Sequence, residues 1–289
     1  MRIGLHALGI GDAARPEIIR EVAMAAESCG FATLWAGEHV IQVDSPASPY
    51  PYSPDGRIAV PADADWLDPL LALSFAAAVT SRIGLATGVL LLPEHNPVVI
   101  AKQAATLDKL SSGRATLGIG IGWSAEEFAA LGVPFARRGQ RAAEYVAAMR
   151  TLWSDDVASF DGDFTGFSGI RVNPKPVRDR RIPVVVGGNS DAALNRAADF
   201  GDGWYGFNLP TAAVAERVSA LAAACERQGR PPEELTVAVA LSDGSPTLLA
   251  SLAEVGVTEL VVVGTPPATP DAARDWVADL AVRWKTTDP

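Results

Sequence analysis

The feature that most constrains the fold of this chain is a regular alternation of short β-rich runs with amphipathic, alanine-rich stretches of helical periodicity. The β-rich runs begin near Ile3, Ala32, Ile83, Ala115, Pro183, Asp202, Leu235 and Thr258. The helical stretches cover Pro16–Ser28, Leu67–Thr80, Pro97–Leu110, Arg137–Leu152, Asp191–Ala198, Ala212–Glu226, Pro246–Glu254 and Pro270–Arg283. About eight such units predict an α/β fold, a (β/α)8 TIM barrel, with residues 1–289 as a single domain. A doubly wound open sheet is the rival, although it usually needs fewer strands.

Two connections are too long to be plain turns. Val40–Asp65 follows the second strand and is rich in proline, with tyrosines at Tyr50 and Tyr52. Trp153–Arg181 precedes the fifth strand, and we expect a short hairpin in it near Ser159–Phe164. Long segments in a compact barrel tend to be lids or binding loops. The first follows a strand, so it should emerge at the C-terminal mouth, where Tyr50 and Tyr52 would face a substrate.

Composition restricts the partners and the location. The formal net charge of −10 argues against nucleic acid or an anionic membrane as a partner. Apolar runs such as Leu70–Val79 are too short to span a membrane. Cys29 and Cys225 are far apart, and no Cys/His, HxH or HExxH spacing suggests a metal site. The chain enters a strand at Arg2–Leu8 without a signal peptide, so we expect a cytoplasmic protein with reduced cysteines.

A glycine turn, Gly187-Gly188-Asn189-Ser190, joins the fifth predicted strand to a helix that starts at about Asp191. Glycines let the backbone approach a ligand closely, and the free N–H groups of a first helical turn attract anions. Ser190 is a natural N-cap. The turn therefore predicts a phosphate site, although a plain connection before a capped helix would have the same sequence.

Small residues recur on the faces of the strands that should point into the barrel. On the first strand Gly4 shares this face with His6. The other small residues are Gly84, Ala86 and Gly88 on the third strand, and Gly118, Gly120 and Gly122 on the fourth. Most barrels fill their interior with bulky branched residues. The pattern predicts a lumen with room for a flat ligand, unless large side chains from the other strands fill the space.

All three histidines, His6, His39 and His95, lie in or just after predicted strands and so at one end of the barrel. The Glu38-His39 pair is the best acid/base candidate, because the unperturbed pKa of histidine suits proton transfer near neutrality. The structural alternative is that this pair only anchors the long loop that follows it.

Four segments carry a family resemblance: Phe31–His39 (FATLWAGEH), Thr87–Pro97 (TGVLLLPEHNP), Ala101–Trp123 and Val186–Trp204. They resemble the bacterial luciferase-like monooxygenase superfamily, and the resemblance weakens after about Leu209. Three further elements are similar to an actinobacterial branch that depends on the deazaflavin coenzyme F420: Gly122-Trp123 to Glu127-Phe128, Leu131–Phe135 and Tyr50–Arg57.

The resemblance implies a luciferase-like barrel with a flavin or deazaflavin at its C-terminal mouth. The phosphate would reach Gly187, Gly188, Asn189 and Ser190, while His6, Gly122 and Trp123 would border the cofactor or substrate. A bulge with a non-prolyl cis peptide at Gly88-Val89 would back the ring. Relatives often carry an acidic residue followed by histidine after the second strand; Glu38-His39 matches, with glutamate where aspartate is frequent.

These observations predict an F420-dependent oxidoreductase that transfers a hydride between coenzyme F420 and a small organic substrate, with His39, aided by Glu38, exchanging the proton. The alternatives are an FMN-dependent monooxygenase supplied by a separate reductase, and a non-catalytic flavin or deazaflavin-binding protein. A barrel aldolase or isomerase is also open, but none of the four lysines lies near the C-terminal end of a strand. The resemblance further implies a homodimer.

Overall fold

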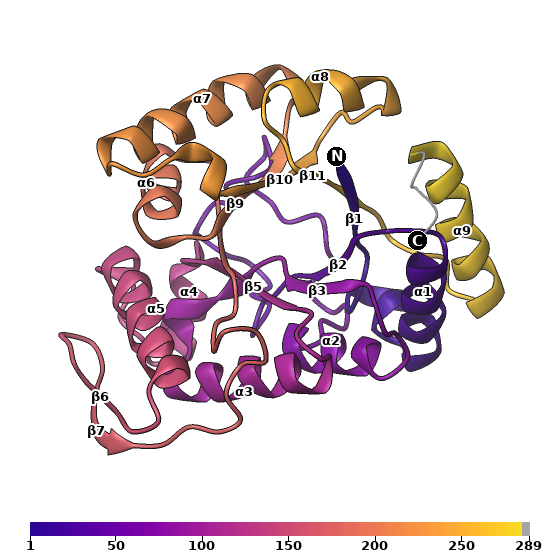
Figure 1. The fold of residues 1–289 in the computed structure, drawn as a ribbon. Helices are drawn as coiled ribbons and strands as arrows, with labels where there is room; N and C mark the ends of the chain where they lie inside the picture. Colours follow the sequence, from indigo (N-terminus) through magenta and orange to yellow (C-terminus); the bar gives the residue numbers. More distant parts are fainter. Residues whose placement is uncertain (285–289) are drawn as a thin grey trace.

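Eight parallel strands close into a barrel in the computed structural model, which describes residues 1–284. They are β1 (Arg2–His6), β2 (Thr33–Ala36), β3 (Gly84–Thr87), β5 (Ala115–Gly120), β8 (Val184–Gly187), β9 (Gly203–Leu209), β10 (Thr236–Leu241) and β11 (Glu259–Val263). Pairing of β1 with β11 and of β3 with β5 completes the ring, and helices surround it (Figure 1). The predicted barrel is confirmed, and each of these strands begins within one residue of its predicted start.

The outer layer is formed by the helices. These are α1 (Pro16–Ser28), α2 (Pro69–Ala77), α3 (Pro97–Leu110), α4 (Ala125–Ala130), α5 (Arg138–Ser154), α6 (Asp191–Phe200), α7 (Thr211–Arg227), α8 (Leu249–Glu254) and α9 (Pro270–Trp284), with 3-10 turns at Gly11–Ala14, Leu92–Glu94 (η2), Pro232–Glu234 and Pro246–Leu248. Only α4 was not predicted; it is six residues long and starts at a Ser124 cap, whose hydroxyl accepts the Glu127 N–H at 3.2 Å. Within residues 1–284, no helix combines the length and apolarity needed to cross a bilayer.

The segment before β8 contains the predicted hairpin. Its strands, β6 (Ala158–Asp161) and β7 (Gly166–Ile170), are antiparallel and lie outside the ring of helices (Figure 1). The hairpin extends beyond the predicted Ser159–Phe164 at both ends, and its turn lies at residues 162–165. There the Glu144 carboxylate of α5 accepts the backbone N–H groups of Asp163, Phe164 and Thr165.

Two aromatic side chains fill much of the barrel interior. Trp35 of β2 and Tyr205 of β9 stack with ring centroids 4.7 Å apart, next to Ala86, Val185, Ala238, Ala240 and Val261. A Cβ on Gly4 would lie 2.8 Å from Nε1 of Trp35, and one on Gly118 would lie 3.5 Å from its ring. The prediction of an open lumen is therefore wrong at this depth, because the small residues make room for Trp35 rather than for a ligand.

Candidate active site

The C-terminal ends of the strands bring most of the predicted site residues to one mouth of the barrel. Glu38 and His39 follow β2, Gly88-Val89 follows β3, Gly122-Trp123 follows β5, and the glycine turn begins at the end of β8. Parallel barrel strands all end on the same face, so segments far apart in sequence meet there. The contacts made by each group decide what it can do.

His39 is held by a carboxylate that sequence reasoning missed. Its Nδ1 lies 2.9 Å from Oε2 of Glu127 in α4, and its ring meets Trp66 and Trp123 edge to face at centroid distances of 4.9 and 5.7 Å. Glu127 also accepts the backbone N–H groups of Val40 and Ile41 at 2.7 and 3.3 Å. The ring is thus fixed on three sides, and Nε2 has no hydrogen-bond partner in residues 1–284.

Glu38 serves a different histidine, so the prediction that it assists His39 is wrong. Its two oxygens each lie 3.0 Å from Nε2 of His95, and one accepts the Leu91 N–H at 2.6 Å. Burial disfavours the imidazolium of His95, but the hydrogen bond to Glu38 and its charge raise the pKa of His95 overall. Glu38 therefore ties the end of β2 to the short strand β4 (Leu90–Leu91) and to the start of the segment that leads into α3.

A third carboxyl group, Glu94 in η2, lies in the same region without a partner. The residue is 6% exposed, and neither oxygen has a hydrogen bond among the described residues. Burial, and then the charges of Glu127 and Glu38, raise the pKa of Glu94 to about 9. Glu94 is therefore a neutral acid at pH 7. Despite these carboxylates, no group of three or more His, Cys, Asp or Glu in residues 1–284 is arranged to hold a metal ion.

His6 lies beneath the mouth and is an uncharged support. Its Nδ1 is 3.2 Å from the Tyr205 hydroxyl, and burial lowers the pKa of His6 to about 4. A Cβ on Gly88 would lie 3.3 Å from its Cε1, and one on Gly37 would lie 3.3 Å from its Nε2. His6 thus packs under the chain that carries Val89.

The Gly88–Val89 peptide bond is cis, as the family resemblance implied. The Val89 side chain lies between two glycines: an added Cβ on Gly120 or on Gly187 would come within 2.7 Å of one of its methyl groups. Val89 is half-buried, and it joins Phe207 at the upper edge of the interior aromatic cluster. The result is an apolar ledge at the centre of the mouth, above the filled part of the lumen.

Hydrogen bonds within the protein occupy most polar groups of the glycine turn, so only some of them are available to bind a ligand. Gly188, at φ +119°, donates to the Tyr205 carbonyl and accepts from Nε1 of Trp204. The Asn189 amide is committed to the Phe207 backbone at 2.7 and 3.1 Å. Ser190 caps α6 as predicted, with its Oγ 3.3 Å from the Ala193 nitrogen. In the described part of the chain, the backbone N–H groups of Asn189 and Ser190 have no acceptor.

Two arginines near this turn were also missed by the sequence analysis. Arg196 of α6 has a buried Nε with no partner, and burial and the charge of Arg138 lower the pKa of Arg196. Arg138 of α5 donates its Nε to the Gly122 carbonyl at 3.1 Å and stacks on Phe135, 3.8 Å from the ring centroid. Neither arginine forms an ion pair within residues 1–284, although the chain carries a net charge of −10.

The loop after β2 crosses this mouth, as predicted. Tyr50 packs against Trp123 and Tyr52, and Tyr52 against Phe207, with centroids 5.3 to 5.5 Å apart. Asn208 donates to the Tyr52 carbonyl at 2.7 Å, and on the other side Glu126 accepts backbone N–H groups from the loop. Burial raises the pKa of Tyr52, so its hydroxyl stays protonated. The loop places two tyrosines over the space between His39 and the glycine turn.

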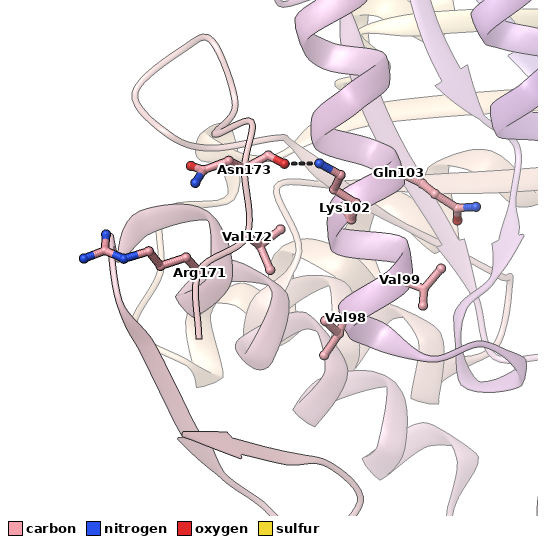
Figure 2. Close-up of a pocket in the computed structure, with 7 residues that line it drawn as sticks. All are labelled: Val98, Val99, Lys102, Gln103, Arg171, Val172 and Asn173. Carbon is pink, nitrogen blue, oxygen red and sulfur yellow. Dashed lines mark hydrogen bonds between the residues drawn. The ribbon is translucent and has the colours of Figure 1, made fainter. Parts of the chain in front are cut away.

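A separate depression of about 370 Å³ lies on the outer side of α3 (Figure 2). It is lined by Val98, Val99, Lys102, Gln103, Arg171, Val172 and Asn173. The Lys102 Nζ donates a hydrogen bond to the Asn173 carbonyl. None of the residues described at the mouth lines this depression, so it is not part of the candidate site.

Comparison with known proteins gives a consistent answer about the family. Residues 3–242 match the family model described as luciferase-like monooxygenase. An uncharacterized protein of Mycobacterium tuberculosis is 39% identical over 261 residues, which cover 89% of this chain and 90% of that protein.

Two solved structures share the fold over the whole chain. The coenzyme F420 dependent tetrahydromethanopterin reductase from Methanopyrus kandleri has a TM-score of 0.74 and 16% identity, and covers 100% of this chain and 99% of its own. The EDTA monooxygenase from Chelativorans sp. BNC1 has a TM-score of 0.79 and 15% identity, with 100% and 95% covered. At these identities the likeness extends to the fold alone.

Proposed function

The chain belongs to the luciferase-like monooxygenase family of oxidoreductases and monooxygenases, and on that premise we propose that it is an F420-dependent oxidoreductase. It would transfer a hydride between coenzyme F420 and a small organic substrate at the barrel mouth. The observation that supports the proposal is the placement of the imidazole of His39 across an apolar ledge from a glycine turn; within residues 1–284 its Nε2 has no partner, and two backbone N–H groups of the turn have no acceptor. Among the fold relatives, one is F420-dependent and another is a monooxygenase.

The groups at the turn fit the charged tail of such a cofactor. Three donors lack an acceptor within residues 1–284: the backbone N–H groups of Asn189 and Ser190, and the buried Nε of Arg196. A buried donor without an acceptor, such as the Arg196 Nε, is costly, and an anion satisfies such donors with strong charge-assisted hydrogen bonds. Arg138, which pairs with no carboxylate of the described residues, adds a second positive charge. These donors would hold a phosphate.

The ledge and the aromatic side chains fit the ring system. Val89 offers an apolar surface, and the rings of Trp123 and Tyr50 pack against each other in the same mouth. When bound, the deazaflavin ring would supply or accept the hydride. Water would be excluded by Tyr50 and Tyr52 of the covering loop.

The proton is handled by this chain's own residues. His39 would give or take it at Nε2, while Glu127 holds Nδ1 and so fixes the tautomer and the ring plane. A hydride that moves to or from a carbonyl carbon requires a proton at the adjacent oxygen, and an imidazole suits that task near neutral pH. Glu38 would contribute only indirectly, by positioning His95 and Leu91.

The test is a fluorescence titration of the purified protein with F420 and, separately, with FMN, followed by a substrate screen under hydride-transfer conditions. We expect saturable F420 binding and substrate-dependent change in the F420 absorbance. Tight FMN binding without a response to F420 would instead favour the FMN-dependent monooxygenase, with reduced flavin from a separate reductase. Binding without turnover by any donor would indicate a carrier.

A further inference from the structure

Among the described residues, the proposed mechanism gives a role to the buried acids Glu38 and Glu127 of the mouth but not to the Glu94 carboxyl group. It is packed against the segment that leads from β5 into α4: an added Cβ on Gly122 would lie 2.8 Å from Oε1 of Glu94, and 2.4 Å from the Phe128 ring. Both carboxyl oxygens are buried, and neither has a partner in the described residues. A buried polar group without a partner is expensive, so its retention needs a reason.

The charges that face Glu94 come from every neighbouring element. Glu127 in α4 and Glu38 after β2 both act on Glu94 through their negative charge, and each carboxylate is hydrogen-bonded to one histidine, His39 and His95 respectively. Asp68, before α2, adds its charge at His95. Arg138 approaches from α5, but its Nε donates to the Gly122 carbonyl rather than to a carboxylate. Both histidines are thus bonded to other carboxylates, and within residues 1–284 no basic side chain pairs with Glu94.

We propose that an anionic cofactor binds to this mouth more tightly when Glu94 carries its proton than when Glu94 is ionised. The inference rests on the proposed function, because it takes Gly122 as part of the cofactor surface. A neutral Glu94 lets the anion approach Gly122 without repulsion, whereas an ionised Glu94 adds an uncompensated negative charge directly behind that glycine. Only a proton moves: the O–H bond of Glu94 breaks as pH rises, and solvent takes the proton.

The sign of the effect follows from linkage. Burial and the charges of Glu127 and Glu38 place the pKa of Glu94 at about 9, far above its ordinary value. An anion favours the protonated form, so binding raises this pKa further and takes up a proton when the pH is near or above it. Affinity is therefore fully present below about pH 8 and falls as the pH rises through 9.

The experiment measures the dissociation constant of F420 from pH 6 to 10.5 for the wild-type protein and for Glu94→Gln, which keeps the size and neutrality of the acid but has no proton to lose. The wild-type protein should lose affinity roughly tenfold or more across the alkaline range, and Glu94→Gln should lose much less. Glu254→Gln, an exposed change on α8, is the matched control and should follow the wild type. FMN serves as a second probe.

Parallel pH dependences in the wild type and in Glu94→Gln would overturn the inference while leaving the proposed function intact. Absence of F420 binding at every pH would overturn the proposed function and this inference with it. If Glu94→Gln fails to fold, proton uptake by the wild-type protein decides. Mixing with F420 at pH 9 in weak buffer should take up a measurable fraction of a proton per site, with much less uptake at pH 7; equal uptake at the two pH values would overturn the inference.

Discussion

The two ends of the barrel mouth have opposite chemistry. Around β2 and β5, the carboxyl groups of Glu38, Glu94 and Glu127 gather with His39 and His95; Glu38 is bonded to His95 and Glu127 to His39. Beyond β8, the donors are backbone amides and the two arginines described above, and no carboxylate of residues 1–284 pairs with either guanidinium. The ledge formed by Val89 separates these regions.

This difference would give a bound cofactor one orientation. An anionic tail is attracted by the unpaired donors at one end, so it should lie there rather than beside Glu38 and Glu127 at the other. The ring would then lie over Val89 with its reactive edge towards His39. Proton exchange and anion capture are thus expected to be separable functions, and variants at each end should affect different measurements.

The largest expected effect comes from removing the imidazole at the acidic end. His39→Asn should slow hydride transfer about 10²- to 10⁴-fold, because a positioned acid/base typically contributes that much. The F420 dissociation constant should change little, since the anion donors are elsewhere. Stopped-flow absorbance of F420 with the substrate found in the screen measures both. His95→Asn is the comparison: this histidine is bonded to Glu38 rather than facing the substrate, so a loss as large as that in His39→Asn would contradict the assignment.

A smaller effect of the opposite kind is expected at the basic end. Arg196→Ala should weaken F420 binding about 10- to 100-fold, the range for a hydrogen bond to a charged group, and leave the rate at saturating cofactor nearly unchanged. The salt dependence of binding should also decrease, because one charge contact is lost. Arg227→Ala removes an exposed arginine of α7 that bonds Asn195, and should bind like the wild type. Equal affinities of the wild type and Arg196→Ala would remove this arginine from the anion site.

The fold could be predicted from the sequence because its signals are local. The periodicity of a few consecutive residues predicts each strand and each long helix. The Ser190 cap is equally local, because its hydroxyl accepts the N–H group of Ala193, three residues later. Position after a strand was also enough to bring His39, Val89 and Gly187 to one mouth, since all barrel strands end on the same face.

The pairings inside the site were not predictable in the same way. His39 and Glu127 are 88 residues apart, and α4 is too short to show helical periodicity, so the adjacent Glu38 was the natural but wrong partner. The prediction of an open lumen was wrong for a related reason. Glycines that face inward show where their own strands leave space, but they do not show that Trp35 of another strand fills it. Arg196 lies in the middle of α6, where only the packed structure shows its unpaired Nε.

The smallest expected effect comes from the ledge between the two ends, and it should affect both at once. Gly120→Ala places a Cβ 2.7 Å from a Val89 methyl group, so the half-buried Val89 must shift. We expect a loss of about 1 kcal/mol in the free energy of unfolding, at the low end for overpacking because Val89 can move towards the mouth. F420 affinity and hydride transfer should each fall less than tenfold.

Gly166→Ala is the control, since its Cβ would meet only a backbone oxygen at 3.5 Å. In Gly120→Ala/Val89→Ala the clash is gone, so urea unfolding should show less than additive destabilisation. If the destabilisations of the two single variants simply add up in the double variant, Val89 does not pack on Gly120. The ledge would then not separate the acidic end of the mouth from the basic end.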